Sequence, residues 1–309
     1  MQHFYSNGKL LITGEYLVLD GALALAIPTK YGQSLYIEPK ETNFLDWESI
    51  DHEGNLWFSD HFVFEEGQMI SKSSNEVSSR LIGIFKAIQK LNPSVFNNSG
   101  LKFRSILDFP NNWGLGSSST LINNLASWAK IDPFELLKGT FEGSGYDIAC
   151  AHHNSPITYQ LKETRIIKEV DFCPSFKDSL FFVHLNKKQN SRDAILNYKK
   201  KSAFSELVIS EINDITRQII ECQSLSKFEE LLNNHEEILS KVLNTSTIKC
   251  QHFKDYEGTV KSLGAWGGDF ILAVGNASSR QYFKDRGYNT IINFDEMALG
   301  QNKKSLTFL

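Results

Sequence analysis

Residues 114–120 read Gly114-Leu115-Gly116-Ser117-Ser118-Ser119-Thr120, between an apolar run that ends at Phe109-Pro110 and a segment, 121–129, with apolar residues at helical spacing. Glycine has no side chain, so the backbone of this turn can approach a bound group closely. Three serine hydroxyls follow where a helix begins, beside unpaired backbone N–H groups and the positive end of the helix dipole. This arrangement is typical of a phosphate-binding turn. The alternative interpretation is a glycine-serine loop with a serine helix cap.

The composition is that of an ordinary globular protein, with 41% hydrophobic and 22% charged residues. A chain of 309 residues exceeds one typical core, so we expect two domains, spanning residues 1–168 and 169–309. The net charge of −4 gives no reason to expect a nucleic acid or an anionic membrane as partner. Four widely spaced cysteines without a Cys-x-x-Cys motif predict free thiols in a reducing cytoplasm.

The segment Leu10–Ile27 is apolar enough to suggest a signal peptide or a membrane span. Glu15 and Asp20 lie inside it, and a charge at membrane depth is expensive, so the sequence argues against both. We expect buried strands joined by a turn at Asp20-Gly21. Lys9 and Glu15 are the charged members of this region, and such charges must reach solvent, find a partner or serve a ligand. They are candidates for a structural ion pair or for a functional site.

Periodic patterns predict the other elements of the chain. The expected strands cover residues 31–37, 57–64, 101–109, 180–185, 270–274 and 288–294. The expected helices cover residues 77–91, 121–129, 204–222, 228–243 and 277–286. Asp132-Pro133 predicts the start of a further helix, with Asp as the cap and Pro at the first position. The acidic segment 46–53 is expected to be a solvated hairpin or loop.

A second chemical segment reads Gly143-Ser144-Gly145-Tyr146-Asp147-Ile148-Ala149. Asp147 enters an otherwise apolar run, where its carboxylate could form a turn or cap, or act as a base or metal ligand on a rigid edge. His152 and His153 follow, and adjacent histidines on a strand point to opposite faces. They would make a poor chelating pair, so we interpret them as structural.

Three separated segments together resemble the GHMP kinase superfamily of small-molecule kinases. They are Gly8-Lys9 with Gly14-Glu15, residues 114–119 after Pro110, and Gly264-Ala265 with Gly267-Gly268. Their order and spacing carry the resemblance, which spans nearly the whole chain. Within the superfamily, the mevalonate-pathway branch is similar, and phosphomevalonate kinases are the most similar. That similarity rests on residues 14–20, residues 143–149, Asp269 and the pair Lys188 and Ser191.

The resemblance implies an α+β fold of two domains. The N-terminal domain would be like domain 2 of ribosomal protein S5, and the C-terminal domain would be ferredoxin-like. It also implies an ATP-dependent kinase that uses Mg²⁺, works in isoprenoid biosynthesis as a monomer or homodimer, and phosphorylates a small molecule, phosphomevalonate. A mevalonate kinase, a decarboxylase similar to diphosphomevalonate decarboxylase, and a non-catalytic metabolite-binding protein of the same fold remain alternatives.

The resemblance also assigns roles to residues. Asp147 would act as the catalytic base, and Lys9 would neutralise the transferred phosphoryl group. The residues expected to bind the ATP phosphates are Gly114, Leu115, Gly116, Ser117, Ser118 and Ser119, with Ser118 as the Mg²⁺ ligand. The residues expected to bind the substrate are Glu15, Lys188, Ser191, Gly264, Ala265, Gly267, Gly268 and Asp269.

Three features depart from the family pattern. Trp266 stands where the family usually has a small residue, so it is expected either to fill part of the acceptor pocket or to pack away from it. The Gly8-Lys9 pair lacks its usual preceding proline. The acidic residue that some relatives use as a second magnesium ligand has no clear counterpart, because Glu142 is near but out of register.

Overall fold

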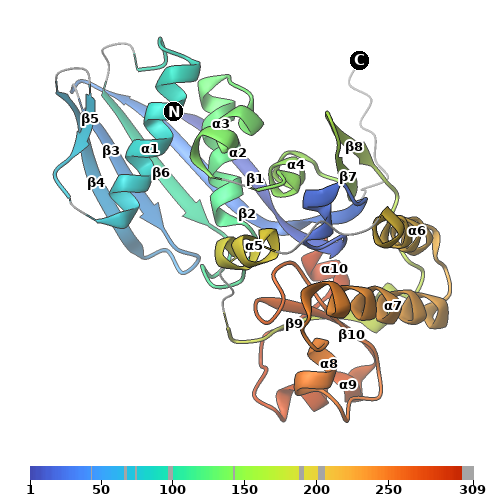
Figure 1. Ribbon diagram of the computed structural model, residues 1–309. Helices are drawn as coiled ribbons and strands as arrows, with labels where there is room; N and C mark the ends of the chain where they lie inside the picture. The colour runs from blue at the N-terminus through green and yellow to red at the C-terminus, as the bar shows by residue number, and fades with distance from the viewer. Residues whose placement is uncertain are drawn as a thin grey trace, which may run out of the picture. The chain divides into compact units, whose positions relative to one another are not determined.

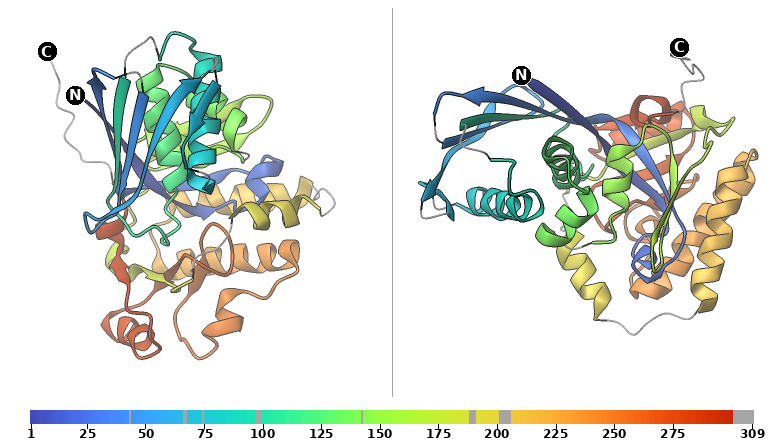
Figure 2. Two further views of the ribbon diagram at one scale, coloured as in Figure 1. Left: turned by 90° about the vertical axis from the view of Figure 1, so that its left-hand side faces the viewer. Right: turned by 90° about the horizontal axis from the view of Figure 1, so that it is seen from above.

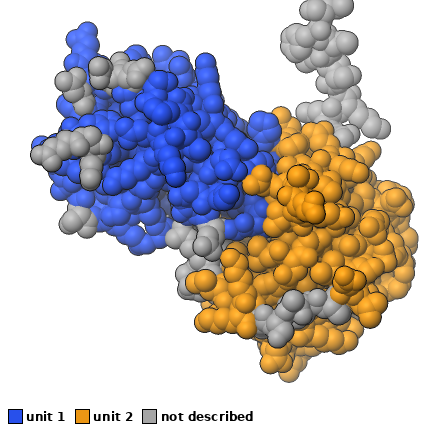
Figure 3. Space-filling view, turned by 45° about the horizontal axis from the view of Figure 1, so that its top comes forward, with its two compact units in different colours: residues 1–8, 31–111, 115–152 blue, residues 9–30, 112–114, 153–309 orange. Residues whose placement is uncertain are grey.

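The computed structural model describes residues 1–42, 44–65, 68–73, 75–96, 100–141, 143–187, 191–200 and 206–300. The chain forms two compact units, each built from separate segments (Figure 3). Unit 1 contains residues 1–8, 31–111 and 115–152, and unit 2 contains residues 9–30, 112–114 and 153–309. The strands β1 (Gln2–Thr13) and β2 (Ala24–Lys40) contribute residues to both units. The domain boundary expected at residues 168/169 stays a prediction.

Unit 1 is a sheet with helices on one face (Figure 2). The strand order is β5-β4-β3-β6-β2, and only the β3–β6 pair among these is parallel. The strands besides β2 are β3 (Phe44–Ile50), β4 (Leu56–Glu65), β5 (Gln68–Ser71) and β6 (Gly100–Leu107). The helices are α1 (Glu76–Leu91), α2 (Ser117–Ala129), α3 (Pro133–Thr140) and α4 (Tyr146–His152).

An aromatic cluster forms the core of unit 1. Phe85 of α1 is fully buried and contacts Trp47, Phe62 and Phe103 of three neighbouring strands, with ring centroids 5.5–5.9 Å apart. Such tilted and edge-to-face pairs add to the free energy gained by burying the rings. The helices are held by this core, and α2 is the helix that carries the serines of the 114–120 turn.

Unit 2 contains an antiparallel sheet of four strands in the order β10-β11-β9-β12. These strands are β9 (Leu180–His184), β10 (Val260–Ser262), β11 (Phe270–Val274) and β12 (Ile291–Asn293). In the same unit, β2 pairs with β7 (Ile157–Leu161), which pairs with β8 (Arg165–Glu169). All five residues of β9 and of β11 are buried, so both are interior strands.

The helical elements of unit 2 surround these strands. They are α5 (Ser191–Lys199), α6 (Glu206–Glu221), α7 (Leu225–Leu243), α8 (Ile248–His252), α9 (Ala277–Lys284), α10 (Phe294–Met297) and the 3-10 helices η1 (Leu17–Asp20) and η2 (Lys177–Ser179). The long helices α6 and α7 pack against each other (Figure 1). Ser224 caps α7 by accepting a hydrogen bond from the Lys227 backbone.

Several elements confirm the sequence-based expectations. Helix α1 covers the predicted 77–91, and Asp132 caps α3 with Pro133 at its start. The four cysteines are free, as predicted. Within the described stretches of the chain, no helix has both the length and the apolar character that crossing a membrane requires.

Two local expectations are wrong, and a third is wrong in part. The acidic segment 46–53 does lie in a hairpin, between β3 and β4, but residues 46–50 are strand and not a solvated turn, because Leu45 and Trp47 are buried in the core while Glu48 pairs with Lys102 and Arg104. The predicted second strand before Asp20-Gly21 is instead the 3-10 helix η1, which Gly21 ends with a φ of +90°. The segment with His152 is helix α4 rather than a strand.

Candidate active site

The glycine-serine turn forms the N-terminus of α2 in unit 1. Gly116 is the cap residue, and its φ of +88° lies in the left-handed region that favours glycine. Its carbonyl oxygen accepts hydrogen bonds of 3.0 Å from the backbone N–H groups of Ser119 and Thr120. Ser118 is exposed, whereas Ser119 is buried. The start of α2 therefore offers a hydroxyl and helix N-terminal N–H groups to a ligand.

Asp147 is joined to this turn through Ser119. The Ser119 hydroxyl donates a hydrogen bond to Asp147 Oδ2, and the Ile148 backbone N–H lies 3.1 Å from Asp147 Oδ1. Asp147 belongs to the first turn of α4 and is half-buried. The sequence thus predicted two residues, Asp147 and Ser119, that the structure brings together within unit 1.

A buried polar network anchors α2 below the turn. Thr120 Oγ1 donates to Gln33 Oε1 at 2.5 Å, and Asn124 Nδ2 donates to the Gln33 carbonyl at 2.8 Å. Gln33 Nε2 donates to Ser105 Oγ, and Ser6 Oγ donates to Asn124 Oδ1, both at 2.7 Å. Buried polar groups that are hydrogen-bonded fix a unique arrangement. This network therefore sets the register of α2 on strands β1, β2 and β6.

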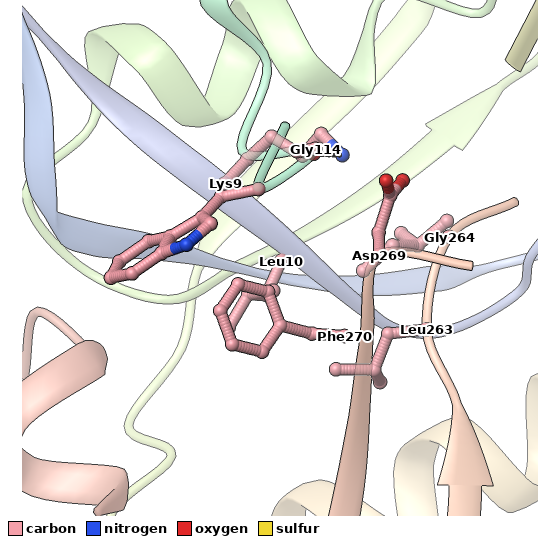
Figure 4. A pocket seen from close by; sticks show the side chains of 9 residues that line it. Lys9, Leu10, Gly114, Leu263, Gly264, Asp269 and Phe270 are labelled. Carbon is pink, nitrogen blue, oxygen red and sulfur yellow. Dashed lines mark hydrogen bonds between the residues drawn. The ribbon is translucent and has the colours of Figure 1, made fainter. Parts of the chain in front are cut away.

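Unit 2 contains an open pocket of about 230 Å³ (Figure 4). It is lined by Lys9, Leu10, Leu11, Trp113, Gly114, Leu263, Gly264, Asp269 and Phe270. Residues from three distant parts of the sequence meet here, and each part contains one of the predicted family segments. The pocket thus gathers Lys9, Gly114, Gly264 and Asp269, four of the predicted site residues.

A close contact and a backbone angle explain why glycine stands at two positions of this pocket. Lys9 Nζ donates to the Gly114 carbonyl oxygen at 2.8 Å. A Cβ atom at Gly114 would lie 2.2 Å from Asp269 Cγ, so a side chain there would displace the carboxylate. A Cβ atom at Gly264, where φ is +60°, would lie 4.0 Å from Lys9 Nζ. Gly114 therefore lets the Asp269 carboxylate lie against the backbone. At Gly264 it is the positive φ that favours glycine, because a Cβ atom there would make only an ordinary contact with Lys9.

A buried charged cluster lies elsewhere in unit 2; we call Glu15, His235, Glu236 and Lys261 the lysine cluster. Lys261 is fully buried, and its Nζ is 2.5 Å from Glu15 Oε1 and 3.7 Å from Glu236 Oε1. Glu15 is also fully buried, at 0% exposure. The substrate role expected for Glu15 stays a prediction, and the structure places its carboxylate beside Lys261 in the interior.

The same cluster binds backbone groups on both sides. Lys261 Nζ donates to the Ser262 carbonyl at 2.9 Å, and Glu236 Oε1 accepts from the Ser262 N–H at 3.1 Å. His235 Nε2 accepts from the Gly14 N–H at 3.0 Å, so the proton of this neutral ring resides on Nδ1.

Burial controls the protonation of the lysine cluster. It raises the pKa of Glu15 to about 7 and that of Glu236 to about 7, although the Lys261 ammonium lowers both. Burial, and then Lys261, hold the pKa of His235 well below its usual range. Two carboxylates therefore surround one ammonium, and the surplus negative charge favours retention of one proton by the pair near neutral pH.

The remaining predicted residues lie in the turn between β10 and β11, at the start of α5 or outside the described residues. Ala265, Gly267 and Gly268 belong to the turn between β10 and β11. Asp269 has a φ of +56°, and its backbone N–H donates to the Lys187 carbonyl at 2.7 Å. Lys188 lies outside the described residues, as does Glu142, and Ser191 begins α5.

Trp266 packs in the interior, which is the second of the two positions expected for it. It is 7% exposed and belongs to an apolar cluster with Leu17, Tyr198 and Leu239. Trp266 stands where the family usually has a small residue, and its large side chain contributes to the core of unit 2.

Sequence reasoning missed Lys261, Glu236 and the Gln33 network. Lys261 carried a weak signal, because it is a charge between Val260 and Leu263, directly before the glycine segment 264–268. Glu236 carried none, since it lies among other polar residues of an amphipathic helix and only the packing shows that it is buried.

Neither a protein-family model nor a curated protein sequence matches the chain. Solved structures do match it. Methanococcus jannaschii mevalonate kinase is 15% identical, with a TM-score of 0.70 over 94% of this chain and 97% of that one. Streptococcus pneumoniae phosphomevalonate kinase in complex with phosphomevalonate and AMPPNP is 17% identical, with a TM-score of 0.65 over 95% of this chain and 100% of that one.

Lactococcus lactis galactokinase, complexed with galactose, is 13% identical, with a TM-score of 0.62 over 97% of this chain and 94% of that one. The protein therefore has the α+β, two-domain fold of the GHMP kinases, as its three glycine segments predicted.

Proposed function

We propose that the protein is an ATP-dependent kinase that phosphorylates a small molecule of the mevalonate pathway, with phosphomevalonate as the acceptor. One observation carries the proposal. In a GHMP kinase fold, the N-terminus of α2 presents the 116–119 turn with Asp147 hydrogen-bonded to Ser119. Phosphoryl transfer needs positioned charges more than covalent chemistry, and this arrangement supplies both phosphate-binding groups and a carboxylate.

The start of α2 would bind the ATP phosphates. Its N–H groups and the positive end of the helix dipole favour anionic oxygens, and the exposed Ser118 adds a hydroxyl. Among the residues that the structure describes, no three His, Cys, Asp or Glu side chains gather as a metal site. The Ser118 hydroxyl is an oxygen donor of the kind that Mg²⁺ takes, and Mg²⁺ commonly has few protein ligands besides phosphate oxygens and waters. Ser118 would hold the ion, whose charge would neutralise the phosphate oxygens.

Asp147 would accept the remaining proton of the acceptor's phosphate group, or orient that group, so that a phosphate oxygen faces the γ-phosphate of ATP. The Ser119 hydrogen bond fixes one carboxylate oxygen, so the side chain has a defined orientation at the start of α4. A carboxylate in this role contributes by position, because it need only receive or orient a proton while the acceptor's phosphate oxygen attacks the γ-phosphorus and ADP leaves.

Lys9 would neutralise the negative charge of the transferred group. Its ammonium lines the unit 2 pocket and is held by the Gly114 carbonyl. Gly114 precedes Leu115 in the chain, so this lysine binds the peptide group that leads into the glycine-serine turn. A fixed positive charge at such a position stabilises charge that develops in the transition state.

The choice of phosphomevalonate rests on the basic segment after β9. In the sequence, Lys187 and Arg192 flank the Lys188–Ser191 pair, which resembles the substrate segment of phosphomevalonate kinases. The Lys187 carbonyl is bonded to the backbone of Asp269, a residue that lines the pocket. An acceptor that already carries a phosphate needs fixed cations.

The free cysteines support the cytoplasm as the compartment of the protein.

A screen of ATP consumption tests the function. The purified protein is assayed with Mg²⁺ and mevalonate, phosphomevalonate, diphosphomevalonate or galactose, and the products are identified by mass spectrometry. We expect ADP and a diphosphate product from phosphomevalonate. Release of CO₂ and inorganic phosphate from diphosphomevalonate would indicate a decarboxylase. Preference for mevalonate would indicate a mevalonate kinase, and ligand binding without turnover would indicate a metabolite-binding protein.

A further inference from the structure

Side chains of the lysine cluster make hydrogen bonds to both chain segments that form the walls of the unit 2 pocket. On one side, His235 accepts a hydrogen bond from Gly14 and Lys261 pairs with Glu15, and these two residues follow directly from β1, the strand that carries Lys9. On the other side the cluster binds both backbone groups of Ser262, which precedes the pocket residues Leu263 and Gly264. A single group of side chains thus joins the two walls from inside the fold.

We propose that Lys261 is a positioning residue, which sets the place of the Lys9 ammonium in the pocket through its ion pair with Glu15. Lys261 touches no residue that the proposed function assigns to catalysis, so it acts through the backbone of the two walls. Its importance for turnover rests on the proposed kinase function, whereas its effect on Lys9 does not.

Backbone geometry next to Glu15 supports this role. Tyr16 has a φ of +61°, and Gly14 has a φ of +84°. A positive φ is unfavourable for a residue with a side chain, such as tyrosine, and persists only where its surroundings hold it. The His235 bond to Gly14 and the Lys261 bond to Glu15 supply that restraint on the residues directly before Tyr16. The turn after β1 is therefore held in a strained form by the cluster.

The chemistry of the cluster favours position over stability. A buried ion pair contributes little net stability compared with apolar side chains of the same shape, because both charges lose their hydration. The ion pairs do fix the position of the Lys261 ammonium relative to the carboxylate oxygens of Glu15 and Glu236. If Lys261 served stability alone, an uncharged pair of similar shape would replace it without loss of function.

The double variant Lys261→Met/Glu15→Gln tests the proposal, because it removes one charge of each sign and keeps the side-chain volumes similar. The matched control is Lys102→Met/Glu48→Gln, which removes a 2.6 Å ion pair from the unit 1 sheet. Thermal unfolding shows whether each variant folds. Acetylation of Lys9 by acetic anhydride, followed by mass spectrometry, reports the position of the ammonium without any need for turnover.

We expect the double variant to remain folded, to unfold at a lower temperature than the wild type because Glu236 loses its counter-ion, and to acetylate Lys9 several-fold faster. Its kcat should fall about 10- to 100-fold with a small change in the KM for ATP, the scale expected when a catalytic group is misplaced. The control should match the wild type in both measurements. If Lys9 of a folded double variant is acetylated at the wild-type rate, the inference is overturned. A wild-type protein without turnover would refute the proposed function and leave the acetylation test intact.

Discussion

Asp147 in unit 1 and Glu15 in unit 2 are both acidic residues within two positions of a glycine, and the sequence assigned both to the active site. The structure separates them by environment. Asp147 is half-buried and binds the Ser119 hydroxyl at the start of a helix, whereas Glu15 is fully buried and binds the Lys261 ammonium. A partly accessible carboxylate with a neutral partner can exchange a proton with a ligand. A buried carboxylate with a cationic partner holds the chain in place.

The comparison predicts that Lys261→Met will have the largest effect on stability. Loss of the ammonium leaves Glu15 and Glu236 buried without a counter-ion, and breaking a buried ion pair in this way costs about 3–5 kcal/mol. Urea unfolding monitored by circular dichroism measures the free energy of unfolding. A change below about 1 kcal/mol would show that solvent reaches the cluster and would remove the contrast between the two carboxylates.

Asp147→Asn should have the converse effect, with a large loss of turnover and little loss of stability. The amide keeps the shape and the contact with Ser119 but cannot accept the acceptor's proton, so kcat should fall by about 10²-fold or more. Steady-state kinetics gives kcat, and calorimetry checks that ATP·Mg²⁺ still binds. Turnover close to that of the wild type would exclude Asp147 as the base and place it with Glu15 among structural carboxylates.

The protonation of the lysine cluster predicts a stability difference that depends on pH. The pKa of Glu236 is raised from 4.5 to about 7 in the folded state, so the folded protein binds more protons than the unfolded chain within that range. The free energy of unfolding should therefore fall as the pH rises from about 5 to 7, by at most about 1.4 kcal/mol per pH unit for one proton.

Glu236→Gln isolates this effect. His235, whose pKa is lowered, contributes the opposite slope below its usual pKa, but it is present in both proteins. We expect the wild type to lose stability relative to Glu236→Gln as the pH rises towards 7, and the difference to level off above it. If the free energies of unfolding of the two proteins change with pH in parallel between pH 5 and 8, Glu15 and Glu236 do not share a proton near neutral pH.

The smallest expected effect is that of Ser119→Ala. It removes the hydrogen bond that orients Asp147 but leaves the carboxylate, and a single such bond contributes about 1–3 kcal/mol. We expect kcat to fall about 5- to 100-fold, with less effect than Asp147→Asn and an unchanged KM for ATP. Ser118→Ala is the informative companion, because its hydroxyl is assigned to the metal and phosphates and its loss should weaken ATP binding instead.

Local sequence signals predicted much of the fold and several residues of the site. Helix α3 follows from Asp132-Pro133, and α1 follows from its apolar spacing, because caps and periodicity are local properties. The meeting of Lys9, Gly114 and Gly264 in one pocket was implied by three motifs in a known order. These motifs needed no packing information to be recognised.

What the sequence did not reveal depends on partners far along the chain. Strand β3 was expected to be a solvated hairpin or loop because the acidic Glu48 finds its cations, Lys102 and Arg104, only on the neighbouring strand. The sequence left a structural ion pair open for Glu15, but it could not name the partner Lys261, which lies 246 residues away. Burial of a charge is a tertiary property, and no local pattern around Glu15 reports it.

The long separation between Glu15 and Lys261 also has a consequence for synthesis on the ribosome. Every segment of unit 1 has been made once residue 152 has emerged, so that unit can begin to fold while translation continues. At roughly 5–20 residues per second, Glu15 waits about 10–50 s for the lysine that neutralises it. During that interval the β1 segment of unit 2 exposes apolar strand and an unpaired carboxylate. The chain therefore folds from its N-terminal unit onwards. The pocket wall that carries Lys9 is made early but reaches its final structure only after Lys261 has been made.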